Sequence, residues 1–168
     1  YCTIDVGDAL GAAAYDGTGI GARDFTASWC NIYGGRRSVN CDRNGSISYS
    51  FCHGQADDPT GVSHESGIRM GADSYIGYNK IGCDALDYPP DAGCSACLTG
   101  YGDFATIERN TVEYNYISKT AGGYGAYGGS SPSKPFPNAN HIIFRHNIFQ
   151  RNPASQTGLT TGFYGTIS

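Results

Sequence analysis

The segment between Cys52 and Gly67 holds the densest group of side chains that could do acid–base chemistry. Its histidines and carboxylic acids are His53, Asp57, Asp58, His64 and Glu65. Histidines and carboxylates are the side chains that most often transfer protons in enzymes, and grouped carboxylates also suit a calcium ion. We therefore predict that this segment borders a functional site.

The elements that position this segment are short and repeated. Five segments each contain a β-branched or aromatic run, a polar residue where the chain must bend, and a second apolar run; they begin at Phe25, Ile47, Ile76, Ile107 and Ile143. Nowhere does the chain sustain the i, i+3, i+4, i+7 spacing of an amphipathic helix. The pattern predicts an all-β chain whose coils stack about 4.8 Å apart, as in a parallel β-solenoid.

The polar residue at the bend suggests a side-chain ladder between coils. Asn79 and Asn110 occupy the same place in their repeats, with Ser28 and Ser50 before them and His146 after. Asn tolerates left-handed backbone angles, and its amide can bond the equivalent amide one coil away. We expect one continuous ladder; the alternative is that Asn is simply common in loops.

The composition fits a single domain over residues 1–168 in an oxidising compartment. The chain has 168 residues, 7 cysteines and a formal net charge of −4. Cytosolic chains rarely carry so many cysteines, so we predict a secreted, extracellular protein. The acidic balance gives no electrostatic footprint for nucleic acid, and no apolar run approaches the roughly 18 residues of a membrane span. We expect neither nucleic acid nor a membrane as a partner.

The repeat alignment also predicts a disulfide. It places Cys30 and Cys52 in one column, and Cys2 is a further candidate for that column. Adjacent coils bring Cα atoms within the range that a disulfide allows. We therefore expect Cys30 to pair with Cys52.

The remaining cysteines follow from the loops. Cys83 is expected to pair with Cys94 and close the acidic loop between them, with Cys97 as the alternative partner. Cys41 is expected to be a buried thiol beside the Met70 column. The Cys94–Cys97 spacing suits half of a zinc site, but the second half is missing.

The segment His64-Glu65-Ser66-Gly67-Ile68-Arg69 resembles a coil of the right-handed parallel β-helix proteins of the pectate-lyase-like group. Such proteins often carry His-x-Asp-Gly-Ile-Gln; here Ser66 replaces the acid and Arg69 replaces the Gln. The resemblance extends from about residue 20 to about residue 152. Together with the repeats, it implies a right-handed parallel β-helix of about six coils, with Ile47, Ile76, Ile107 and Ile143 stacked inside.

What the resemblance implies about function is contact with an extracellular polysaccharide along the face that carries Arg69. A lyase of this fold uses Arg or Lys as its base, which makes Arg69 and Lys80 candidates, with His64 and Glu65 beside Arg69 as further catalytic candidates. An inverting glycoside hydrolase would need two carboxyl groups about 6.5–9.5 Å apart. The expected substrate-binding residues are His53, Asp57, Asp58, Lys80 and Tyr78. No cofactor is implied beyond a calcium ion, for which the candidate ligands are Asp57, Asp58, Glu65 and Asp73.

Several of these residues have simpler interpretations. Asp73 precedes a repeat and suits a turn. Arg69 lies between Ile68 and Met70, so an outward, solvated side chain is the alternative to a base. Tyr78 is one of several tyrosines that could stack on sugar rings or, alternatively, form an outward ladder that stabilises the sheet.

The rival to a polysaccharide-processing enzyme is a non-catalytic structural or adhesive protein. About six coils are few for an enzyme of this fold, and no amphipathic helix is evident to cover the ends of the stack. We therefore also consider that the chain is a segment of a longer solenoid, or a subunit that stacks end to end into a filament.

Overall fold

The computed structural model describes residues 1–7, 17–56, 64–83, 93–100, 106–120, 124–127, 139–150 and 163–164, and these residues form strands and turns without a helix. In chain order the strands are β1 (Cys2–Asp5), β2 (Thr18–Ser28), β3 (Cys30–Tyr33), β4 (Arg37–Ser48), β5 (Phe51–His53), β6 (His64–Arg69), β7 (Tyr75–Gly77), β8 (Lys80–Cys83), β9 (Gly93–Thr99), β10 (Ile107–Glu108), β11 (Thr111–Glu113), β12 (Tyr116–Thr120), β13 (Tyr124–Tyr127), β14 (Ala139–Asn140), β15 (Ile143–Arg145), β16 (Ile148–Phe149) and β17 (Phe163–Tyr164). Across this described part, no helix is long and apolar enough to cross a membrane.

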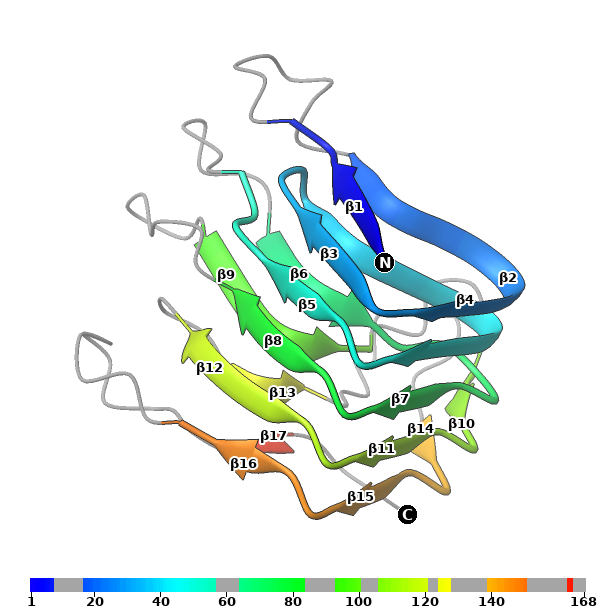
Figure 1. Cartoon of the computed structure of the whole chain (residues 1–168). Coiled ribbons are helices and arrows are strands. Elements are labelled where there is room, and N and C mark those ends of the chain that lie inside the picture. Colours follow the sequence, from blue (N-terminus) through cyan, green and yellow to red (C-terminus); the bar gives the residue numbers. More distant parts are fainter. Residues whose placement is uncertain are drawn as a thin grey trace.

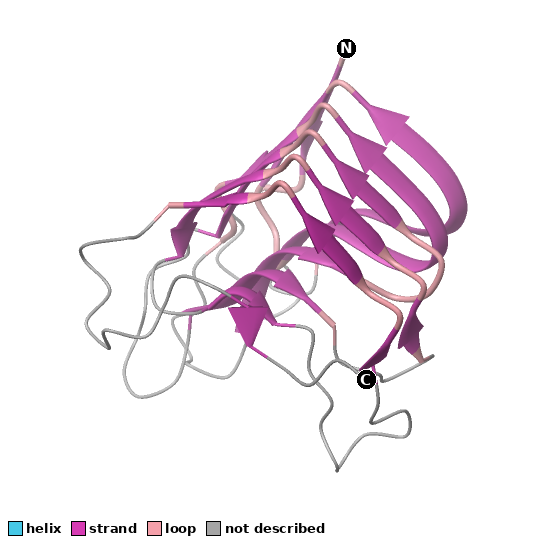
Figure 2. Ribbon diagram, turned by 90° about the horizontal axis from the view of Figure 1, so that it is seen from below, coloured by secondary structure: helices cyan, strands magenta, loops and turns pink. Residues whose placement is uncertain are grey.

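The strands pair in parallel and return to the same sheets in chain order. One sheet has six strands, β1-β3-β5-β8-β12-β16, and a second has nine, β15-β11-β7-β4-β6-β9-β13-β17 with β2 against β4. Strands β10 and β14 form a third, two-stranded sheet. We use the word pass for one stretch of chain that runs through these sheets before the next stretch pairs beside it. Figures 1 and 2 show the strands of successive passes lying side by side in a curled stack. The prediction of an all-β chain built from parallel strands is confirmed.

The chain bends at two columns of residues with left-handed backbone angles. The first corner column is Asp24, Asn44, Asp73, Arg109 and His141, and the second corner column is Trp29, Tyr49, Tyr78, Tyr114 and His146, with φ between 49° and 59° throughout. These angles are unfavourable for residues that carry a Cβ atom, so contacts between passes must hold them. Four of the second corners are two residues long and join β4 to β5, β7 to β8, β11 to β12 and β15 to β16.

Three columns of apolar residues fill the space between the sheets. Register places them as Ile47-Ile76-Val112-Phe144, Ile32-Cys52-Ile81-Ile117 and Val39-Ile68-Leu98-Ala126. All are buried except Phe144, which packs against this core while partly exposed. Burying one such isoleucine stabilises a fold by about 1.5–3 kcal/mol. Packing within these columns therefore fixes the register of each pass, and with it the position of each corner, against the neighbouring passes.

A ladder of asparagines follows the second corner column inside the fold. The backbone N–H groups of Ser50, Asn79 and Asn115 donate to the side-chain oxygen of the Asn one pass later, over 2.9, 2.9 and 3.0 Å. The amide nitrogens of Asn79, Asn115 and Asn147 donate to the carbonyls of Ile47, Ile76 and Val112. Each Asn thus satisfies two backbone groups that flank the corner one pass earlier.

Asn110 belongs to a different ladder, so the prediction of one ladder through Asn79 and Asn110 is wrong. Asn110 follows the first corner column, where its side chain accepts from the N–H of Ser74 over 2.9 Å and donates to the carbonyl of Gly71 over 2.7 Å. His146 also lies outside the Asn79 ladder, because it is a second-corner residue. Both corners use the same amide chemistry, which makes their sequences look alike.

Because the two corners have similar sequences, two of the four isoleucines expected in one stack are also misplaced. Ile47 and Ile76 are neighbours in register, as predicted. Ile107 is buried but pairs with Ala139 in the two-stranded sheet. Ile143 is 50% exposed, because the residue after it points into the core. The prediction that all four isoleucines stack inside is therefore wrong for Ile107 and Ile143.

The predicted Cys30–Cys52 disulfide is also wrong. Both residues are free thiols. Register places Cys52 opposite Ile32 and Cys30 opposite Cys2, because the first repeat begins two residues later than the alignment assumes. Cys2 therefore shares the Cys30 position, and Cys52 does not.

The other cysteines agree better with expectation. Cys41 is fully buried, as predicted, and burial raises the pKa of its thiol to about 12. Cys97 is a buried thiol that donates to the carbonyl of Ser118, which removes it as a partner for Cys83. Cys83 is buried and is not a free thiol, but the side chain of Cys94 lies outside the described residues. The Cys83–Cys94 pairing stays a prediction.

Candidate functional site

The structure divides the residues of the predicted polysaccharide site between two sheets. Asp57, Asp58 and the side chain of His64 lie outside the described residues. Glu65 is in β6 of the nine-stranded sheet and is 0% exposed, so it cannot contact a polymer in a surface groove. Arg69, at the end of β6, is half-buried beside Asn40 and Thr99 in register.

His53 and Lys80 lie instead on the six-stranded sheet. The His53 ring stacks on Phe51 at 3.8 Å between centroids, and its Nε2 atom is 2.8 Å from the side-chain oxygen of Asn31. The Lys80 ammonium lies 4.7 Å from the centre of the same Phe51 ring. The structure therefore joins these two predicted residues through Phe51.

Tyr78 does not offer a ring face for a sugar. The second corner column is an aromatic ladder in which Trp29, Tyr49, Tyr78, Tyr114 and His146 stack at 4.8 to 4.9 Å with interplanar angles of 8° to 13°. This spacing is that of the strands themselves, about 4.8 Å. Both faces of Tyr78 are covered by the rings of Tyr49 and Tyr114, so only its edge meets solvent. This geometry favours the interpretation that Tyr78 belongs to a ladder that stabilises the sheet, rather than the interpretation that it stacks on sugar rings.

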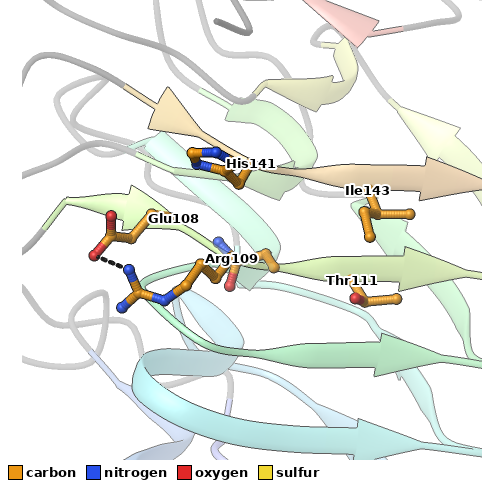
Figure 3. Close-up of a pocket in the computed structure, with 6 residues that line it drawn as sticks. Glu108, Arg109, Thr111, His141 and Ile143 are labelled. Atoms are coloured by element: carbon orange, nitrogen blue, oxygen red, sulfur yellow. Dashed lines mark ion pairs between the residues drawn. The ribbon is translucent and has the colours of Figure 1, made fainter.

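A depression of about 390 Å³ lies beside the first corner column, on the outer side of the later passes. Its lining residues are Glu108, Arg109, Asn110, Thr111, His141 and Ile143. Figure 3 shows Glu108, Arg109 and His141 on one side, and Thr111 and Ile143 on neighbouring strands on the other. The first-corner backbone angles place Arg109 and His141 at this surface, because the chain bends there from β10 to β11 and from β14 to β15.

Ion pairs hold the guanidinium of Arg109 in place. Its Nε and Nη2 atoms donate to the two carboxylate oxygens of Asp73 over 2.5 and 2.9 Å, and its Nη1 atom is 2.6 Å from Glu108. The hydrogen bond from Arg109 keeps the pKa of the Asp73 carboxyl below its ordinary range. Two carboxylates thus surround one guanidinium, and the nearby Arg43 adds a second positive charge that also lowers the pKa of Asp73. Asp73 is a corner residue, as its simpler interpretation predicted.

A second polar group extends the same outer face. The Tyr75 hydroxyl donates to Glu113 over 3.1 Å, and Arg145 donates to the other oxygen of Glu113 over 2.5 Å. The hydrogen bond from Arg145 lowers the pKa of Glu113, whereas burial followed by the bond to Glu113 raises the pKa of Tyr75 to about 12. The Tyr75 ring lies where a Cβ atom on Gly77 would be, so this glycine makes room for it.

The two polar groups are contiguous. Thr111 stands opposite Tyr75 in register, and Ile143 stands opposite Thr111. We call the surface formed by the depression and the Tyr75–Glu113–Arg145 group the outer polar face. It offers fixed acceptors, fixed donors and an exposed aliphatic side chain. A general acid needs a raised pKa, and the pKa values of Asp73 and Glu113 are lowered, so the face suits binding better than acid catalysis.

Sequence reasoning missed the residues of this face. Asp73, Arg109 and His141 come from successive passes, and only the correct register brings them together. The available signal was a polar residue at every first corner, from Asp24 to His141, but it is visible only when the two corners are aligned separately.

No metal site supports the calcium expectation within the part of the chain that the structure describes. Its His, Cys, Asp and Glu residues form no group of three or more that could hold an ion. Two of the four candidate ligands, Asp57 and Asp58, lie outside that part, so the expectation stays untested.

In comparisons with known proteins, no family model, curated protein or solved structure matches the chain.

Proposed function

We propose that the chain is a secreted, right-handed parallel β-helix module that binds an extracellular polysaccharide through its outer polar face without cleaving it. The observation that carries the proposal is the depression in which Arg109, fixed by Asp73 and Glu108, lies beside His141, Thr111 and Ile143. Fixed donors and acceptors around a small apolar surface suit a ligand whose hydroxyl groups surround an aliphatic ring. The hydroxyl groups of such a ligand can bond to protein groups that are already held in place, so binding does not have to pay for ordering these side chains.

The order of the strands supports the β-helix. Each sheet receives its strands in parallel and mostly in chain order, as expected for a chain that circles the same core on successive passes. A right-handed path is the usual one for parallel crossovers. The likeness of residues 64–69 to pectate-lyase-like coils remains a resemblance. The secreted location rests on the cysteine content.

The charge of the depression indicates a neutral polymer. Arg109 is already paired with Asp73 and Glu108, so a uronate would have to compete with these two carboxylates and would lose binding energy to repulsion from them. A lyase substrate must carry such a uronate, and a hydrolase needs a carboxylic acid with a raised pKa. Both conditions argue that the outer polar face binds its ligand without cleaving it.

The test is calorimetric titration of the protein with neutral and uronate-containing polysaccharides. We expect binding to neutral polymers, at least tenfold weaker binding after Arg109→Ala, and unchanged binding after Arg23→Ala. Arg23 is the matched control because it is an exposed arginine that also pairs with an aspartate, Asp42, in an earlier pass. Equal loss in both variants, or preference for uronates, would contradict the proposal. Release of reducing ends or unsaturated products would restore the enzyme hypothesis.

A structural or adhesive role is the second candidate, and two observations favour it. The aromatic ladder ends at His146, one face of which has no stacking partner among the described rings. Phe144 and Phe149, the residues of the last described pass that pack against the core, are only partly buried. If a broad set of polysaccharides shows no binding and native mass measurement finds a series of end-to-end oligomers, this candidate replaces the first.

A further inference from the structure

Cys2 and Cys30 are direct register partners on adjacent parallel strands. Strand β1 pairs with β3 from Cys2 opposite Cys30 to Asp5 opposite Tyr33, and the N–H of Cys2 donates to the carbonyl of Trp29 over 3.2 Å. Neighbouring parallel strands lie about 4.8 Å apart. Disulfides form across Cα separations of roughly 4.4–6.8 Å, so the backbone of this pair already meets the geometric requirement.

The two side chains also lie close to each other. The Cys30 thiol is buried and donates to the carbonyl of Ser28 over 3.3 Å, while Cys2 is exposed. The pKa of the Cys30 thiol is raised, first by burial and then by the adjacent Cys2 side chain, which hydrogen-bonds with Cys30. The Cys2 thiol is therefore open to solvent, and the Cys30 thiol lies within hydrogen-bonding reach of it.

Two other free thiols of the described residues, Cys41 and Cys52, are worse placed. Cys52 stands opposite Ile32 and is fully buried, as is Cys41. Burial raises the pKa of each of these two thiols to about 12, so thiolate is scarce at both.

We propose that Cys2 and Cys30 form a disulfide when the protein meets a small-molecule disulfide such as oxidised glutathione. The Cys2 thiolate attacks one sulfur of that oxidant, forms a mixed disulfide and releases one thiolate. Deprotonated Cys30 then attacks the Cys2 sulfur, which forms the Cys2–Cys30 bond and expels the second thiolate. Two protein thiols are oxidised, one external disulfide is reduced to two thiols, and the protons pass to the released thiolates and to water.

The bond would secure an edge of the fold. Strand β1 is the terminal strand of the six-stranded sheet and pairs only with β3 among the described strands. Such a strand opens most easily, and a covalent link to its neighbour prevents that opening. This inference does not depend on the proposed polysaccharide binding.

The experiment is peptide mapping without reduction, after incubation with oxidised glutathione, of the wild type and the variants Cys2→Ser, Cys30→Ser and Cys41→Ala. We expect a linked peptide containing Cys2 and Cys30 in the wild type and in Cys41→Ala, and in neither serine variant. The oxidised wild type should also melt several degrees above the reduced form, a gain that Cys2→Ser loses. Cys2 is exposed, so this variant remains informative even if Cys30→Ser fails to fold. A stable glutathione adduct on Cys2 with Cys30 still free, or a Cys30–Cys52 link, would overturn the proposal.

Discussion

Replacing Asn115 with alanine should remove much of the stability of the fold. Asn115 is buried, and its side chain accepts from the N–H of Asn79 over 2.9 Å and donates to the carbonyl of Ile76 over 2.9 Å. In Asn115→Ala both backbone groups lose these partners inside the protein. Each buried, unsatisfied group costs about 1–3 kcal/mol, so the expected loss is about 2–6 kcal/mol. Small domains are stable by only about 5–15 kcal/mol.

The assay is urea unfolding of Asn115→Ala beside the matched control Asn147→Ala. Asn147 makes the equivalent bonds in the last described pass of the ladder, donating to the carbonyl of Val112 over 2.8 Å and accepting from the N–H of Asn115 over 3.0 Å. It is only half-buried, so water can replace those bonds, and we expect a loss of about 1 kcal/mol. An equal loss in the two variants, with unchanged dependence on urea, would refute the claim that burial of the ladder determines its contribution.

Three further outcomes follow from the outer surface. Gly77→Ala should displace the Tyr75 ring and destabilise the fold by about 1–3 kcal/mol, with tyrosine fluorescence reporting the movement. The pKa of Glu113 is lowered in the folded state by the hydrogen bond from Arg145. This pairing therefore stabilises the protein fully above the ordinary pKa of a glutamate, and the stabilisation is lost as pH falls through the lower pKa of the folded state. In Glu113→Gln the free energy of unfolding, measured by urea titration at each pH, should change less across that acidic range. Tyr78→Ala should lose two ring contacts worth about 0.5–1.5 kcal/mol each yet leave polysaccharide affinity unchanged in titrations, and a loss of affinity would show that the ladder edge binds sugar.

The fold class could be predicted because the chain repeats a short apolar–polar–apolar pattern and lacks helical spacing. Ile47 and Ile76 were placed correctly, since their segments have the same length on both sides of the corner. The fourth repeat is misplaced by the sequence pattern. The segment that begins at Ile107 has apolar residues and an Asn at the same spacing as the segment from Val112 to Ile117, which is the one that pairs with the Ile76 segment and lies five residues later. Both segments turn a corner with a buried Asn, and hydrophobic pattern alone does not distinguish one corner from the other.

The candidate site was less accessible to sequence reasoning. The polar segment after His53 attracted attention by its residue types, yet Glu65 in it points into the interior. Arg109 gave no such signal, because its role depends on Asp73 one pass earlier and His141 one pass later. An error of a few residues in register separates these three side chains, so their convergence could be found only from the three-dimensional structure.

The two-residue second corners have a consequence for how such a chain can change in length. Strands β7 and β8 are joined by two residues, as are β11 and β12, whereas ten residues separate β5 from β6 and nine separate β8 from β9. An insertion in the long connections leaves every register pair in place, and its entropic cost grows only slowly with loop length. An insertion at Tyr78 or Asn79 would shift an aromatic ring and an amide out of step with both neighbouring passes. Deletions and grafted peptides should therefore be tolerated between β8 and β9 and rejected between β7 and β8, so the same fold can acquire new loops on one side while the opposite side stays constant in length.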